Sequence, residues 1–139
     1  MRVGLIGFGT IGRAVAERLR RGEGGEARLC AVLVRDTGRL RPDDRAHHGD
    51  LFCADRGAFM RARLDWVVEA AGHAALREHG SAVLRGGANL LALSAGALAD
   101  DALLAELRAA ATESGRRILV PSGGMGALDL LTSAAVGAL

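Results

Sequence analysis

The stretch 2-RVGLIGFGTIGRAVAERLR-20 is the part of this 139-residue chain that decides its fold. A short apolar run, residues 2–7, leads into glycines at positions 7, 9 and 12, which have the spacing GxGxxG. Ile11, Val15 and Leu19 follow at intervals of four residues and predict an amphipathic helix over 11–20. The stretch therefore predicts a strand, a tight glycine turn and a helix in immediate succession.

This succession is the context in which a glycine fingerprint binds a dinucleotide, because a second buried strand, predicted at 28–34, completes the βαβ unit. Gly7 permits the tight turn, Gly9 lets a pyrophosphate approach the backbone, and Gly12 lets the helix pack close to the strand. Free N–H groups at the helix N-terminus then face the pyrophosphate. The predicted cofactor contacts in this loop are Gly7, Phe8, Gly9, Thr10, Ile11 and Gly12. The alternative is a glycine turn that binds no ligand.

Strand-like and helix-like runs alternate through the rest of the chain. The further predicted strands are 51–55, 65–71, 89–94 and 117–120, and the further predicted helices are 56–63, 73–85 and 100–114. Residues 36–50 have almost no apolar content and are expected to form a surface loop. Because the strands are continuously apolar, the pattern predicts a doubly wound parallel sheet, a Rossmann fold of three αβα layers, over residues 1–139.

The corner after the second strand should hold the adenosine ribose of the cofactor. Asp36 lies 24 residues after Gly12, near the offset at which a carboxylate binds both ribose hydroxyls and repels a 2′-phosphate. Arg35 precedes it, and an arginine can pair with that phosphate. Both residues are candidate contacts, and they leave NAD and NADP open with a slight preference for NAD. A solvated ion pair in a loop is the alternative.

The carboxyl ends of the fourth and fifth strands should face the nicotinamide half of the cofactor. In a sheet ordered 3-2-1-4-5-6 the crevice opens between the first and fourth strands, outside their carboxyl ends. The predicted contacts there are Ala71, Gly72, His73 and Ser94. His73 could instead cap a helix or face solvent. The glycine-rich loop 121–126 should close the nicotinamide end, unless it is a plain strand-to-helix turn.

Composition excludes several kinds of site. The chain contains no lysine and no tyrosine, so a Schiff-base lysine, a P-loop lysine and a Tyr/Lys proton relay are excluded within it. The 18 basic residues alternate with 16 acidic ones and only four side chains are aromatic, which argues against nucleic acid as a partner. No apolar stretch reaches the ~18 residues of a membrane span, and no histidine or cysteine has metal-ligand spacing. Cys30 in its apolar run is expected to be a buried free thiol, which suits a cytoplasmic protein.

The chain resembles the N-terminal domain of bacterial L-aspartate dehydrogenases in four segments that occur in the same order: VGLIGFGTIGRAV, VVEAAGH, LSAGALAD and VPSGGMGALDLL. The first is common to dinucleotide folds, whereas the last two are more specific, and homoserine dehydrogenases match them less well. The resemblance implies an NAD(P)-dependent oxidoreductase of NAD biosynthesis that interconverts L-aspartate with iminoaspartate or with oxaloacetate plus ammonia. It also implies a cofactor contact at Gly124, where the family usually has alanine.

In the enzymes that the chain resembles, the catalytic histidine and a cofactor-contacting asparagine lie in a second, substrate-binding domain. We expect that domain to be absent from this chain, so no catalytic residue is predicted and the chain alone is expected to be inactive. The nearly uncharged helix predicted over 126–139 would bridge to the missing domain, to a separate subunit or to another copy in a homo-oligomer. In an isolated domain it should leave an apolar patch exposed. The alternatives are a stand-alone NAD(H)-sensing module and the cofactor domain of a homoserine dehydrogenase-like enzyme.

Overall fold

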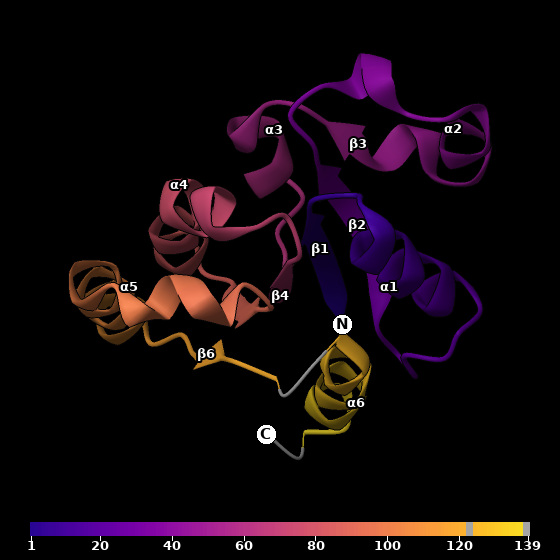
Figure 1. Cartoon of the computed structure of the whole chain (residues 1–139). Coiled ribbons are helices and arrows are strands. Elements are labelled where there is room, and N and C mark those ends of the chain that lie inside the picture. The colour runs from indigo at the N-terminus through magenta and orange to yellow at the C-terminus, as the bar shows by residue number, and fades with distance from the viewer. Residues whose placement is uncertain (122–123, 138–139) are drawn as a thin grey trace.

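The chain folds into a six-stranded parallel sheet with helices on both faces (Figure 1). The computed structural model describes residues 1–121 and 124–137, with side chains for 1–121 and 129–137. The strands lie in the order β3-β2-β1-β4-β5-β6, and each neighbouring pair is parallel. Their bounds are β1 Arg2–Ile6, β2 Arg28–Leu33, β3 Phe52–Cys53, β4 Trp66–Glu69, β5 Asn89–Ala92 and β6 Ile118–Leu119. The predicted doubly wound Rossmann sheet is confirmed, including its strand order.

Six α-helices occur in the described part of the chain, five of them between successive strands and the last after β6. Their bounds are α1 Thr10–Arg20, α2 Pro42–His48, α3 Arg56–Met60, α4 His73–Arg85, α5 Asp101–Ser114 and α6 Gly124–Ala135. Short 3₁₀ turns lie at Thr37–Arg39, Gly49–Leu51 and Ala95–Ala99. The ends of α5 follow from sequence, because the Asp100 carboxylate accepts from the N–H groups of Ala102 and Leu103, and Gly115 ends the helix at φ +65°.

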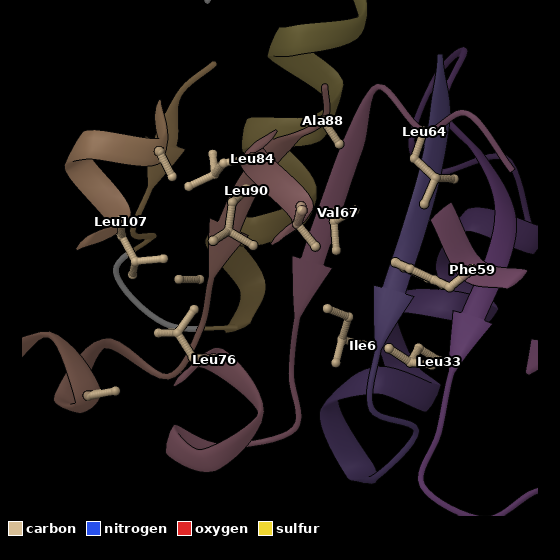
Figure 2. Close-up of a cluster of buried hydrophobic side chains, with 14 of the residues drawn as sticks. Ile6, Leu33, Phe59, Leu64, Val67, Leu76, Leu84, Ala88, Leu90 and Leu107 are labelled. Atoms are coloured by element: carbon tan, nitrogen blue, oxygen red, sulfur yellow. The ribbon is translucent and has the colours of Figure 1, made fainter. Parts of the chain in front are cut away.

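Both faces of the sheet are buried, which explains why its strands are apolar without alternation. Ile6, Leu33, Val67 and Leu90 point toward α3, α4 and α5, where they meet Leu76, Leu84 and Leu107 (Figure 2). Their strand neighbours Leu5, Val32, Val68 and Leu91 point the other way, into a second cluster with Val15 and Leu19 of α1 and Leu131 of α6. The two clusters fix the sheet between two helical layers.

The segment 36–50 is not the plain surface loop that its polarity predicts, because it contains α2. Pro42 starts that helix at its first position, and the Asp44 carboxylate accepts a hydrogen bond of 3.0 Å from the Arg41 backbone N–H. Asp43 and Asp44 lie in its first turn and basic residues in its last, as the helix dipole favours. Capping and charge, which a search for apolar periodicity overlooks, therefore determine this helix.

The last helix, α6, packs on the same face as α1. Leu131 is fully buried there, and Leu130 and Ala134 are half-buried against the same cluster. Val136 beyond the helix is 75% exposed. The large apolar side chains that the described residues expose are Ile11, Val120 and Val136. Packing within the domain thus covers part of the apolar surface of α6 that was expected to be exposed in the isolated domain. Cys30, expected to be buried, is a half-buried free thiol, as is Cys53.

Candidate cofactor site

A cleft of about 570 Å³ opens at the carboxyl ends of β2, β1 and β4. Residues 6–9 of the β1–α1 turn line it between the end of β2, residues 33–35, and the segment 70–79 that leads from β4 into α4. Strand order reverses between β1 and β4, so the cleft lies at the switch point of the sheet. This is where open α/β sheets bind their ligands.

The structure gives a different reason for glycine at each of the three fingerprint positions. Gly7 has φ +92°, and a Cβ there would lie 2.6 Å from Cβ of Ala71. A Cβ on Gly12 would lie under 3.0 Å from the carbonyl oxygen of Gly7, because α1 packs directly against the turn. Gly9 has φ −82°, and a Cβ there would meet no atom within 4 Å. The fold itself requires Gly7 and Gly12, whereas the open space beside Gly9 is available to a ligand.

The N-terminus of α1 faces this space without a cap. Gly9 is the N-cap residue, and no side chain caps the helix. The Arg13 N–H donates the first helical bond, 2.9 Å long, to the Gly9 carbonyl, so the N–H groups of Thr10, Ile11 and Gly12 have no partner within the helix. The side chains of Thr10 and Ile11 are exposed. Free N–H groups and the positive end of the helix dipole fit a pyrophosphate.

The side chain of Phe8 belongs to the core, although the residue lines the cleft. Only 9% of Phe8 is exposed, and its ring meets the Phe52 ring edge-on with centroids 4.8 Å apart. The Arg13 guanidinium lies 5.2 Å from the ring centroid. Phe8 thus anchors the turn against β3, and any contact of this residue with a cofactor falls to its backbone.

A partly buried ion pair that the sequence did not reveal holds α2 against α1. Arg13 donates from Nε to Oδ1 of Asp44 at 3.0 Å and from Nη2 to Oδ2 at 2.8 Å. Asp44 is 8% exposed. The Arg13 guanidinium is the main cause that lowers the pKa of Asp44. Arg13, which follows the fingerprint directly, is therefore committed to a structural pair.

Arg35 and Asp36, the two residues predicted to lie near the adenosine ribose, have different surroundings in the structure. Arg35 is exposed, lines the cleft and has no partner for its guanidinium among the described residues. Asp36 does not line the cleft. Its Oδ1 accepts from the Gly38 N–H at 2.8 Å, and its Oδ2 lies 3.6 Å from Nε of Arg39. The Arg35 guanidinium is thus open to the cleft, while the Asp36 side chain, which is 58% exposed, accepts a hydrogen bond within the turn that follows β2.

At the end of β4 the three predicted contacts take different places. Ala71 lines the cleft. Gly72, at φ +112°, turns the chain into α4 and is its N-cap. His73 is the exposed first residue of α4 and lies beside the 95–99 turn, since a Cβ on Gly96 would be 2.9 Å from its Nε2. His73 therefore faces the β5 side of the site and not the cleft wall.

Glu69, the last residue of β4, is fully buried, and sequence reasoning did not include it among the contacts. Its Oε1 accepts from the N–H of Ala71 at 2.8 Å, from the N–H of Gly72 at 2.9 Å and from Oγ of Ser94 at 2.9 Å. Its Oε2 accepts from the Ser94 N–H at 3.1 Å. Ser94, predicted to contact the cofactor, thus donates its hydroxyl to Glu69. The sequence feature that could have pointed to Glu69 is a single acidic residue at the end of an apolar strand, as in WVVE.

His79 is another cleft residue that sequence reasoning did not place there. Its side chain is 14% exposed, and its Nδ1 has no hydrogen-bond partner. Burial lowers the pKa of His79 below its ordinary value of 6.5. The neutral ring therefore forms part of the cleft wall on the α4 side, where its Nε2 lies 3.7 Å from Oε2 of Glu78.

Other predicted features are located only in part. Gly124 is the first residue of α6, but Ser122 and Gly123 of the predicted nicotinamide loop lie outside the described residues. Residues 1–121 and 129–137 contain no group of three His, Cys, Asp or Glu side chains that could hold a metal ion. Nor does any helix in the described ranges have the length and apolar character needed to cross a membrane.

Comparison with known proteins agrees with this geometry. The chain is 42% identical over 135 residues to L-aspartate dehydrogenase 1 of Bordetella pertussis, covering 96% of this chain and 49% of that protein. It is 37% identical over 136 residues to the L-aspartate dehydrogenase of Archaeoglobus fulgidus, covering 96% and 51%. The crystal structure of aspartate dehydrogenase from Thermotoga maritima superposes with a TM-score of 0.68 at 25% identity, covering 96% and 50%. The chain spans about half the length of the relatives it matches.

The glycine turn, the uncapped helix and the cleft at the switch point all fit a dinucleotide. A family model described as the NAD binding domain of homoserine dehydrogenase matches residues 7–121. The chain therefore belongs to the family that this model describes. Its Rossmann sheet and its similarity to aspartate dehydrogenases agree with this, and the chain is an NAD(P)-binding domain.

Proposed function

We propose that this chain supplies the cofactor-binding half of an L-aspartate dehydrogenase. The observation that carries the proposal is its 42% identity, across 96% of its length, to L-aspartate dehydrogenase 1 of Bordetella pertussis. In the proposed reaction the α-carbon of L-aspartate gives a hydride to NAD(P)⁺ and its amino group loses a proton. The resulting iminoaspartate is hydrolysed by water to oxaloacetate and ammonia.

In this proposal the cleft binds the cofactor in an extended form. The N–H groups at the start of α1 receive the pyrophosphate beside Gly9, and the adenosine ribose lies toward Arg35. The nicotinamide half lies toward the ends of β4 and β5, near Ala71 and His73. Support comes from the open space at Gly9, the unpartnered Arg35 guanidinium and the position of Ala71 in the cleft wall.

Proton transfer and substrate binding are assigned to residues beyond this domain. Oxidation of an amine needs a positioned acid–base group and an anchor for two carboxylates. Glu69 is fully buried and surrounded by donors, so it is a poor candidate for that group. We assign the acid–base group and the anchor to a second domain, a partner subunit or another copy of the chain, which would dock beside α6. The two free thiols are consistent with a reducing, cytoplasmic compartment.

The test is expression of the chain together with the coding sequence that follows it. Formation of NADH or NADPH is then followed with L-aspartate or with homoserine as substrate. We expect reduction that depends on aspartate, and no aspartate oxidation by the purified 139-residue chain alone. Reduction that depends on homoserine would replace the proposed substrate. Turnover of aspartate by the isolated chain would place the acid–base group within it, at His73 or Glu69.

A further inference from the structure

A buried carboxylate joins the segments that follow β4 and β5, just beyond the point where the hydrogen bonds of the sheet stop. The last backbone bonds there are donated by Ala70 to Ile6, at 2.8 Å, and by Leu93 to the Glu69 carbonyl, at 3.0 Å. Beyond these, Ala71, Gly72 and Ser94 have no neighbouring strand, and the Glu69 side chain accepts the N–H of all three.

This carboxylate is unusual in its surroundings. Glu69 is 0% exposed, and it takes part in none of the ion pairs found among the described residues. Burying a charge without a cation is costly unless hydrogen bonds replace the lost water. Its four contacts are all with N–H or O–H donors, which match an ionised, acceptor-only group. The hydrogen bonds that offset the burial of Glu69 all come from residues 71, 72 and 94, so this side chain links the two segments that contain them.

The segments that Glu69 holds are those that border the site. Ala71 lines the cleft, and its Cβ lies so near the turn that a Cβ on Gly7 would be 2.6 Å from it. Gly72 turns the chain so that α4 begins at His73, beside the turn that follows Ser94. The carboxylate therefore fixes the position of two loops, 70–72 and 94–96, relative to each other.

We infer that Glu69 is a positioning residue, which seats the nicotinamide half of the cofactor by clamping these two loops together. The inference rests on the cofactor orientation in the proposed function. It assigns no direct contact between Glu69 and the cofactor, because the side chain lies behind the loop backbone. The adenosine half, beside Gly9 and Arg35, is held by the β1–α1 turn and by β2, which make no hydrogen bond to Glu69.

Glutamine is a sharp probe of this clamp because it keeps the size of the side chain. Its carbonyl oxygen can replace Oε1, which accepts three bonds. Its amide nitrogen must then replace Oε2 and face the Ser94 N–H, donor against donor. We expect Glu69→Gln to push the 94–96 loop away from the 70–72 loop while the strands remain paired.

The experiment measures binding of NADH and of ADP-ribose to the full chain, or of NADPH and 2′-phospho-ADP-ribose if the wild type prefers them. We expect Glu69→Gln to weaken dinucleotide binding roughly tenfold, with ADP-ribose affinity unchanged within about twofold. The fluorescence of bound NADH should also move toward its value in water. Glu106→Gln makes the same change in the carboxylate that accepts a part-buried hydrogen bond from the Ser81 hydroxyl, on another part of the domain; it is the matched control and should leave both affinities unchanged.

Each other outcome overturns the inference. Wild-type affinity and fluorescence in Glu69→Gln would show that the clamp does not position the nicotinamide. An equal loss of affinity for NADH and for ADP-ribose would show that Glu69 supports the whole site and not the nicotinamide end alone. If Glu69→Gln does not fold, as judged by its thermal melting, Glu69→Asp replaces it, since a carboxylate one methylene shorter cannot reach both loops. The same two results in Glu69→Asp would overturn the inference. A wild type that binds neither ligand would overturn cofactor binding as well, so the two failures are distinguishable.

Discussion

Replacement of Gly9 by valine should separate binding from folding. Gly9 has φ −82° and ψ −157°, an extended conformation that valine adopts readily. A Cβ at this position meets no atom within 4 Å. The cost to folding is then limited to the weaker N-cap preference of valine, at most about 1 kcal/mol.

The cost to binding should be much larger. The branched side chain would fill the space where the pyrophosphate meets the N–H groups at the start of α1. A hydrogen bond to a charged group contributes about 1.5–3 kcal/mol, so loss of two such bonds removes at least about 3 kcal/mol. At 1.4 kcal/mol for each factor of ten, we expect Gly9→Val to weaken NAD(H) or NADP(H) binding at least about 100-fold.

Two further glycine variants make the assay specific. Gly49 also has open space around its Cβ position but lies outside the cleft, so Gly49→Val should retain full binding. Gly12→Ala places Cβ against the Gly7 carbonyl and should destabilise the fold by about 1–3 kcal/mol. Urea unfolding measures stability, and quenching or enhancement of NADH fluorescence measures affinity. Gly9→Val that binds as the wild type does, or that loses several kcal/mol of stability, would refute the reasoning.

Three other predictions concern the end of β2, the ion pair between α1 and α2, and the α4 wall of the cleft. Arg35→Ala should weaken the binding of NADPH relative to that of NADH. Asp36→Ala should favour NADPH only slightly, because the Asp36 carboxylate already binds within the turn. If neither variant changes the ratio of the two affinities, the assignment of these residues to the ribose end of the cleft is contradicted. Asp44→Asn should lower the free energy of unfolding by about 1–2 kcal/mol, because it removes the carboxylate that Arg13 binds, and equal urea midpoints would refute it. Because the pKa of His79 is lowered in the folded chain, the unfolded chain binds the proton first, and stability should decline as pH falls below 6.5. In urea titrations between pH 7.5 and 5.5, His79→Leu should reduce that decline. If the variant shows the same dependence of stability on pH, His79 is not its cause.

Much of the fold could be predicted because its determinants are local. Apolar runs gave the strands, the glycine spacing gave the β1–α1 turn, and the period of Ile11, Val15 and Leu19 gave α1. The helix predicted at 73–85 has the same bounds in the structure. What periodicity could not find was α2, because this helix depends on Pro42 and on the capping acid Asp44 rather than on an apolar face.

The site was less predictable, because it depends on where side chains point. Spacing predicted that Arg35 and Asp36 both face the ribose, but only the structure shows that Asp36 turns back to the Gly38 N–H. Phe8 was predicted from its place in the fingerprint, yet its ring packs against Phe52. The contact between Glu69 and Ser94 joins residues 25 positions apart, and no local pattern could reveal it.

The most direct test of the central claim is calorimetric titration of the wild-type chain with NADH and with NADPH. If the cleft at the ends of β2, β1 and β4 is a dinucleotide site, at least one of them should bind saturably at a single site per chain. ADP-ribose should compete with that binding. No heat and no competition with either dinucleotide would contradict the account.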